Sequence, residues 1–153
     1  MFIEITILII FLSFLINGYR AGCIETFGRV LGAIIGFIVA KSYAHAIISW
    51  ALMFVSADIA YTVSFAGLFL LVDYLVGSLF RFADSLLSIF THLPILKQIN
   101  SGLGAVFGFI EAIFVLGGMY WLLSQANTAP FLQDSSVMMF IAGIFKTVFG
   151  VLL

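Results

Sequence analysis

The stretch TFGRVLGAIIGFIVAKSYAHA, residues 26–46, decides the fold class of this chain. Arg29 and Lys41 carry its only full charges, and most of the other side chains are apolar or small. A helix that crosses a bilayer needs about 20 predominantly apolar residues, because each residue advances the helix by about 1.5 Å. The stretch therefore predicts a transmembrane helix, and an extension to Met53 fits the same pattern.

Three further segments meet the same criterion, at residues 2–19, 57–80 and 102–124. None alternates between polar and apolar residues at every second position, as the strands of a membrane barrel would. The sequence therefore predicts an all-α, polytopic membrane protein. We expect four transmembrane helices, arranged as two helical hairpins in a single membrane domain over residues 1–153.

The overall composition excludes a water-soluble enzyme domain. Hydrophobic residues make up 64% of the chain and charged residues 8%, whereas soluble domains have about 45–50% and about 25%. The net charge of −1 provides no basic field for nucleic acid. A single cysteine, Cys23, cannot form an internal disulfide.

Two apolar segments carry a polar stripe and predict helices that lie in the membrane interface. In residues 79–92 the stripe consists of Arg81, Asp84, Ser85, Ser88 and His92, and Pro94 closes the segment. In residues 137–153 one face holds Gly143, Lys146, Thr147 and Gly150. A fifth span is the alternative for this last segment, which is 17 residues long.

A repeat relates the second and fourth predicted spans. Residues 31–38 read LGAIIGFI and residues 103–110 read LGAVFGFI, which indicates a hairpin duplicated in parallel orientation. Small residues recur every four positions in both spans, at Gly28, Gly32, Gly36, Ala40 and Ala44, and at Gly104, Gly108 and Ala112. Such ridges let helix backbones approach closely in lipid. We expect the two spans to pack against each other through them, with a dimer or partner face as the alternative.

Two carboxylates, Asp73 and Glu111, fall deep inside predicted spans. Intramembrane charges are candidate functional sites for proton or ion handling or for partner contact. The alternative is a structural contact to a neighbouring helix. Nearer the interface, Glu25 and Arg29 have the spacing of a local helical ion pair.

No motif for catalysis or for a cofactor accompanies these carboxylates. His45 and His92 are 47 positions apart, without Cys or carboxylate at metal-ligand spacing, and we expect both at the interface. GxSxG, HExxH and phosphate-loop patterns are missing from the sequence. We therefore expect neither an enzyme nor a bound metal or cofactor.

The distribution of basic residues predicts the orientation in the membrane. One side of a four-span chain would hold Arg20, Arg29, Arg81 and Lys97, and the other side would hold Lys41 and Lys146. The more basic side normally faces the cytoplasm. We therefore expect both termini outside.

The run INGYRAGCIETFGRVLGAIIGFIVA, residues 16–40, resembles the first loop and second helix of the colicin V production protein (CvpA) family of bacterial inner-membrane proteins. The family pattern there is a Gly-x-x-x-Gly loop, a Glu and a Gly-rich span, and this chain has Gly18, Gly22, Glu25, Gly28, Gly32 and Gly36. Residues 100–118 resemble the family's last helix, with Gly104 and Gly108. Two positions depart from the pattern. Asn100-Ser101 stands where Asp-Arg or Asn-Arg is common, and Glu111 stands where a basic residue tends to follow.

The resemblance implies a four-span protein of the bacterial inner membrane that is linked to colicin V production and export. Our first hypothesis is a non-enzymatic accessory or scaffold protein for toxin export or envelope maintenance. Its partners would be the lipid bilayer and either further copies of itself or other membrane and export proteins. A small oligomeric transporter or channel subunit that uses Asp73 and Glu111 is the alternative. A simple anchor for another chain is a third hypothesis.

Overall fold

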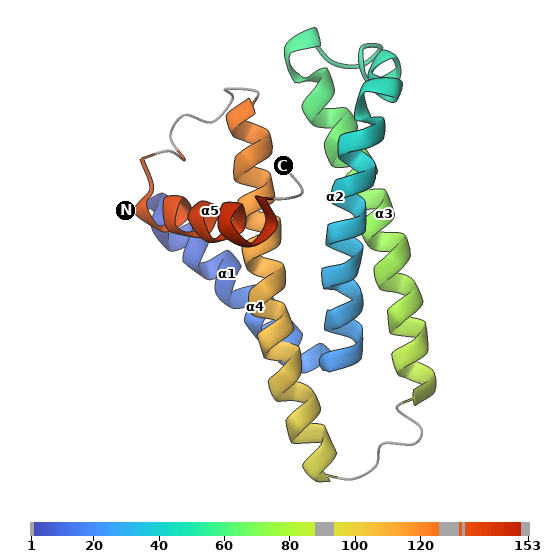
Figure 1. Ribbon diagram of the computed structural model, residues 1–153, viewed down its shortest axis with the longest axis vertical. Coiled ribbons are helices and arrows are strands. Elements are labelled where there is room, and N and C mark those ends of the chain that lie inside the picture. The colour runs from blue at the N-terminus through green and yellow to red at the C-terminus, as the bar shows by residue number, and fades with distance from the viewer. Residues whose placement is uncertain (1, 88–93, 126–131, 133, 151–153) are drawn as a thin grey trace.

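A computed structural model describes residues 2–87, 94–125, 132 and 134–150, which form five helices and no strand (Figure 1). The helices are α1 (Phe2–Ala21), α2 (Cys23–Ala51), α3 (Ala57–Leu87), α4 (Pro94–Gln125) and α5 (Ser136–Phe149). Within this part of the chain, α1 to α4 are long and apolar enough to cross a membrane. The predicted fold class, an all-α polytopic membrane protein, is confirmed.

The predicted interfacial helix over residues 79–92 is not a separate element where the structure describes it. Helix α3 continues without a break to Leu87, so residues 79–87 are its last turns. Neither Gly nor Pro stands between Gly77 and Pro94 to end the hydrogen-bonded ladder. Residues 88–92, with His92, lie outside the described residues.

Helices α1 and α2 meet at a single residue, Gly22. Its φ of 87° is a left-handed backbone conformation that glycine adopts readily. The cap of α2 comes from another helix, because the backbone N–H of Cys23 donates to Oδ1 of Asn100 on α4 at 2.9 Å. A Cβ on Gly22 would collide with the Asn100 side-chain amide. A glycine at this corner therefore allows both the sharp turn and the close approach of α4.

The predicted pairing of the two glycine ridges with each other is wrong. Helix α2 turns its ridge toward α3, where a Cβ on Gly36 would lie 3.0 Å from the carbonyl oxygen of Phe69. Helix α4 turns its ridge toward α1, where a Cβ on Gly108 would lie 3.3 Å from Cα of Gly18. Each ridge is thus covered by another helix of the same chain. Lipid exerts no hydrophobic force that would have favoured one neighbour over the other.

The two covered ridges follow the sequence repeat. An offset of 72 residues relates Gly32 to Gly104 and Gly36 to Gly108. Gly32 and Gly36 both pack against α3, whereas Gly104 and Gly108 both pack against α1. Helices α2 and α4 run in the same direction, as the parallel repeat predicts (Figure 1). The two helices of each expected hairpin therefore have little contact with each other, and the second helix of each packs on the first helix of the other.

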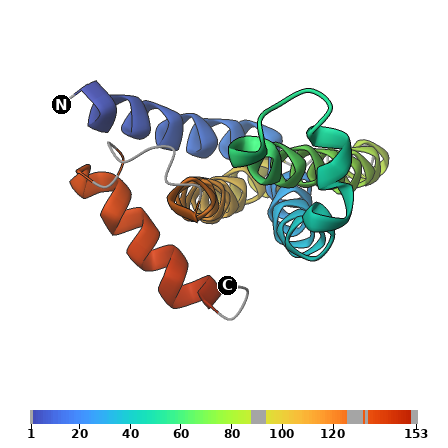
Figure 2. The ribbon, with the colours of Figure 1, turned by 90° about the horizontal axis from the view of Figure 1, so that it is seen from above.

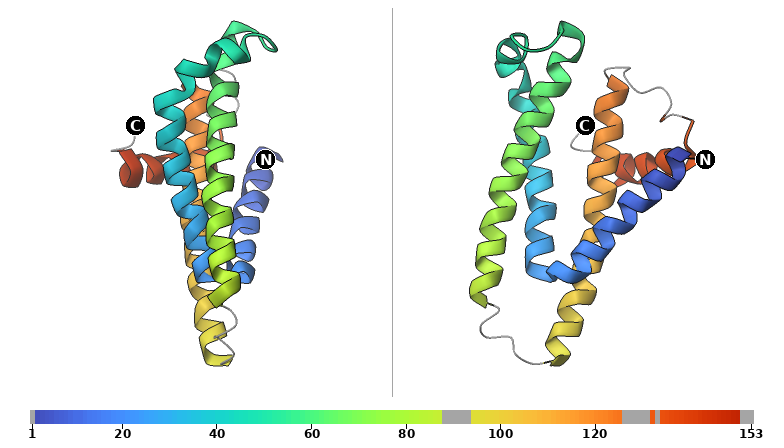
Figure 3. Two further views of the ribbon diagram at one scale, coloured as in Figure 1. Left: turned by 90° about the vertical axis from the view of Figure 1, so that its right-hand side faces the viewer. Right: turned by 180° about the vertical axis from the view of Figure 1, so that it is seen from behind.

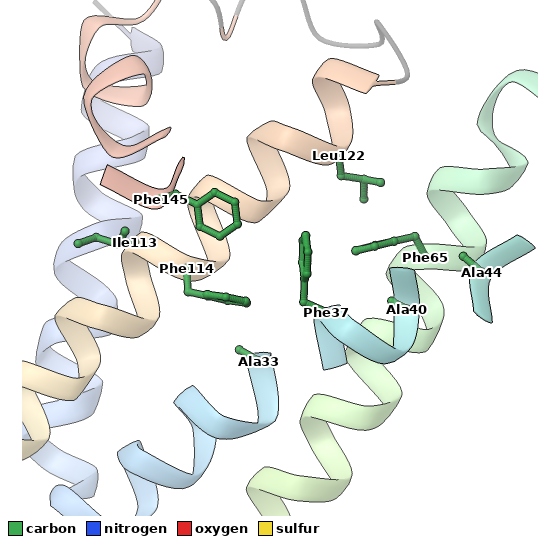
Figure 4. Packing of buried hydrophobic residues seen from close by; sticks show 9 residues of the cluster. All are labelled: Ala33, Phe37, Ala40, Ala44, Phe65, Ile113, Phe114, Leu122 and Phe145. Atoms are coloured by element: carbon green, nitrogen blue, oxygen red, sulfur yellow. The ribbon is translucent and has the colours of Figure 1, made fainter. Parts of the chain in front are cut away.

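Helix α5 runs across α4, at the level of the N-terminal end of α1 (Figures 1 and 2). Its Phe145 side chain lies directly against Gly117 of α4 and is 1% exposed. Figure 4 shows Phe145, Phe114, Phe37 and Phe65 gathered between the helices. Ring centroids lie 5.7 Å apart for Phe37 and Phe114, in an edge-to-face arrangement. Ring contacts join Phe145 of α5 to Phe37 of α2 and Phe114 of α4, and Phe37 in turn contacts Phe65 of α3.

Candidate functional site

An ion pair lies between the two hairpins, inside the membrane-spanning region. Nε of Arg29 on α2 donates to Oε1 of Glu111 on α4 at 3.0 Å, and Nη2 lies 2.8 Å from Oε2. The second contact joins opposite charges but lacks hydrogen-bond geometry. Glu111 is 6% exposed, whereas Arg29 is half-buried. The expected local pair of Glu25 with Arg29 is therefore wrong, because the guanidinium is engaged by a carboxylate from another helix.

The contact between Gly22 and Gly104 explains why Arg29 and Glu111 lie at the same level along their helices. Gly22 and Gly104 touch, since a Cβ on Gly104 would lie 2.9 Å from Cα of Gly22. Arg29 and Glu111 each stand seven residues further along, which is two helical turns or about 10 Å. Because α2 and α4 run in the same direction, the two side chains arrive at the same level. The equal spacing identifies the pair only once the contact of Gly22 with Gly104 is known, and that contact comes from the structure.

Beside the ion pair, a polar groove of about 590 Å³ opens between α2 and α3, next to the end of α1. Asp73, the other predicted intramembrane carboxylate, lies on α3 and lines this groove. Its side chain also lies against α2, where a Cβ on Gly32 would be 2.8 Å from Oδ1. The remaining lining residues are Asn17, Glu25, Arg29, Leu70, Tyr74, Gly77 and Arg81.

Charges of both signs line the groove. Arg29 and Arg81 supply two guanidinium groups, and Glu25 and Asp73 supply two carboxylates. The Arg81 guanidinium lies 5.8 Å from the ring centroid of Tyr74, within the range of a cation–π contact. Charges of both signs in an open groove can hold a ligand that itself carries both signs.

The structure separates the two predicted carboxylates by role. Glu111 is an ion-pair partner of Arg29 and does not line the groove, whereas Asp73 does. Sequence reasoning missed the groove residues Asn17, Leu70, Tyr74 and Gly77, which have no distinctive pattern in the sequence. It also counted Arg29 among the basic residues of one membrane side, and it noted Asn100 only as part of a departure from the family pattern.

The other candidate ligands lie apart from the groove. The His45 ring lies 4.7 Å from the ring of Tyr61, centroid to centroid, and His92 is outside the described residues. Among the described residues, no three His, Cys, Asp or Glu side chains are grouped so as to hold a metal ion. Cys23 is a free cysteine.

Comparison with known proteins adds one finding. The family model described as Colicin V production protein matches residues 3–149, nearly the whole chain. No curated protein and no solved structure matches.

Proposed function

The chain belongs to the colicin V production protein family, and from this premise we propose that it is a non-enzymatic membrane factor. In this role it serves as an accessory or scaffold in toxin (colicin) production and export or in envelope maintenance. Its four apolar helices support a multi-pass membrane location. The location that we propose in particular is the bacterial inner (plasma) membrane.

The observation that carries the scaffold role is the ion pair of Arg29 with Glu111. A buried charge inside a membrane is costly unless it is paired, and here both partners come from the chain itself. The pair links α2 of one hairpin to α4 of the other. This use of the charge supports a structural purpose for Glu111.

The glycine ridges favour packing within the chain over a dimer. Both are covered, by α3 and by α1, so a second copy or another protein would have to bind elsewhere. The opposite face of α1 offers exposed apolar side chains, among them Leu8, Leu12 and Ile16. We propose that the bilayer and partner membrane proteins contact the chain on such faces.

We further propose that both termini are periplasmic. Arg29 no longer counts toward the basic residues of one side, because it is paired with Glu111. Arg20, Arg81 and Lys97 lie toward one end of the helix bundle, and we count Lys41 and Lys146 for the other side. Without Arg29, the excess of basic residues on the Arg20 side falls from four against two to three against two. The excess keeps the same sign, so we propose that the end with Arg20 faces the cytoplasm.

A deletion strain tests the scaffold role. The toxin peptide would be measured inside and outside cells that lack the chain, and again after complementation with the wild type. We expect reduced export that complementation restores, together with a crosslinked complex that contains either a second copy or an export protein. Unchanged toxin levels and a purely monomeric chain in membranes would overturn the proposal.

A transporter or channel subunit is the second candidate, favoured by the open groove that Asp73 lines. Proton and cation flux in proteoliposomes would be compared for the wild type, Asp73→Asn and Glu111→Gln. Asp84→Asn is a matched control on the same helix, since Asp84 does not line the groove. Flux that Asp73→Asn abolishes and Asp84→Asn preserves would establish this candidate. No flux in the wild type would eliminate it.

A further inference from the structure

The polar groove continues into an apolar one. A second cavity, of about 210 Å³, lies between α2, α3 and α4, and Leu70 lines both cavities. The wall of the second cavity is aromatic and aliphatic, with Phe37, Phe65, Phe69, Phe114 and Leu122 among its residues. The two cavities meet at Leu70, and we refer to them together as the amphipathic groove, with the charges at the end near Arg81 and the phenylalanines at the other.

This amphipathic groove is open sideways to the bilayer. Helix α3 packs on α2 and has at most marginal contact with α4. Figure 3 shows α3 and α4 standing apart when the molecule is seen from behind. Leu70 is 63% exposed, and it lies inside the candidate span Ile59–Ser85. A molecule that enters the groove therefore comes from the surrounding lipid.

The length of the amphipathic groove along α3 matches the thickness of one leaflet. Leu70 and Arg81 are eleven residues apart on α3, or about 16 Å, which is about half of a bilayer's ~30 Å hydrocarbon core. Arg81 lies near the end of the span, where lipid head groups begin. A lipid with its head group near Arg81 would thus direct an acyl chain past Leu70 toward Phe69 and Phe114.

The charges select the kind of head group. A pocket that holds only basic residues favours anionic lipids. This groove holds Arg81, and the part of the Arg29 guanidinium that Glu111 leaves free, beside Glu25 and Asp73, so it presents N–H donors for a phosphate and carboxylates for an amine. A primary ammonium group donates hydrogen bonds to carboxylates, whereas a quaternary choline cannot.

We propose that this groove binds a phospholipid with a phosphoethanolamine head group, drawn from the leaflet on the Arg81 side. The phosphate contacts Arg81 and the N–H groups of Arg29 that Glu111 leaves free, the ammonium group contacts Asp73, and one acyl chain occupies the apolar part. The inference does not depend on the scaffold role and would stand if that role failed.

Native mass spectrometry of the purified chain tests the proposal. The protein would be equilibrated with equal amounts of dioleoyl phosphatidylethanolamine, phosphatidylglycerol and phosphatidylcholine, and the bound lipid would be counted. We expect one phosphatidylethanolamine per chain. Arg81→Gln and Asp73→Asn each remove one contact and should lower its occupancy about fivefold. Leu70→Trp should displace it by filling the junction of the two cavities without changing a charge.

Two charged residues that do not line the groove provide matched controls. Arg20→Gln removes a guanidinium from the same end of the bundle, and Asp84→Asn removes a carboxylate from the same helix, both outside the groove. We expect both variants to retain the lipid as the wild type does. Preference for phosphatidylglycerol or phosphatidylcholine would overturn the proposal, as would binding that Arg20→Gln and Arg81→Gln reduce equally. Full retention in Leu70→Trp, with the helical content of the wild type, would also overturn it.

Discussion

The guanidinium of Arg29 and the carboxylate of Glu111 meet across the α2–α4 interface, 82 residues apart in the sequence, with Nε 3.0 Å from Oε1. The contact joins the two hairpins at one level, two turns beyond the touching glycines Gly22 and Gly104. It converts two isolated intramembrane charges, each costly by itself, into one neutral unit. The stability of the bundle should therefore depend on both charges together.

Removal of one partner should be more harmful than removal of both. Glu111→Gln leaves the Arg29 charge unpaired, and we expect a loss of about 3–5 kcal/mol in the free energy of unfolding. Arg29→Gln should have a similar effect, and the double variant should be more stable than the sum of the two losses predicts. Thermal or denaturant unfolding in mild detergent measures these values. Additive losses, or an equal loss in Arg20→Gln, would contradict the ion-pair role.

The side chain of Asn100 should stabilise the corner at Gly22. Its Oδ1 accepts from the N–H of Cys23, which has no partner inside α2. We expect Asn100→Ala to lower the free energy of unfolding by about 1 kcal/mol, the usual value of a helix N-cap. Asn100→Asp keeps the acceptor and should keep most of the stability. Equal losses in both variants would show that the acceptor oxygen is not what matters.

The covered glycines should not tolerate a large side chain. Gly36→Leu and Gly108→Leu place side chains against the backbones of α3 and α1, so each should separate its helix pair and weaken the fold. Gly67→Leu and Gly102→Leu are matched controls on α3 and α4, where a Cβ would meet nothing within 4 Å. These controls should be neutral or slightly stabilising, because glycine is a poor helix former. Unfolding midpoints and crosslinking between paired helices would report both effects.

Docking of α5 should depend on Phe145. This side chain is 1% exposed and packs on Gly117, whereas Phe140 on the same helix is 70% exposed. Phe145→Ala should release α5 to proteases, and Phe140→Ala should not. We expect a smaller loss than the about 3–5 kcal/mol of a water-soluble core, because lipid replaces the transfer contribution. Equal protection of α5 in the two variants would contradict the observed packing.

Reporter fusions would test the proposed orientation. A reporter at Leu153 and another in the α2–α3 connection, residues 52–56, should both be periplasmic. A cytoplasmic reporter at both positions would show that the orientation is reversed. A cytoplasmic reporter at Leu153 alone would show that α5 crosses the membrane as a fifth span.

The sequence by itself determined the fold class. The length and polarity of an apolar run are local properties, and the bilayer thickness sets how long such a run must be to span the membrane. It identified α1 to α4 as spans, and it showed Asp73 and Glu111 to be unusually deep. It also marked the ridge glycines as sites of close backbone approach. The extension of α3 to Leu87 was missed, because a polar stripe looks the same at the end of a span as on an interfacial helix.

Only the tertiary structure decided which helices are neighbours. In a membrane protein most helix faces are apolar, whether they face lipid or another helix, so a pattern of small residues predicts a contact but not its partner. The α2 ridge could face α3 or α4, and only the fold assigns it to α3. The same holds for Arg29, whose nearest opposite charge in the sequence is Glu25 but whose partner in space is Glu111. Pairing of this kind depends on the packing of whole helices, which the local sequence does not encode.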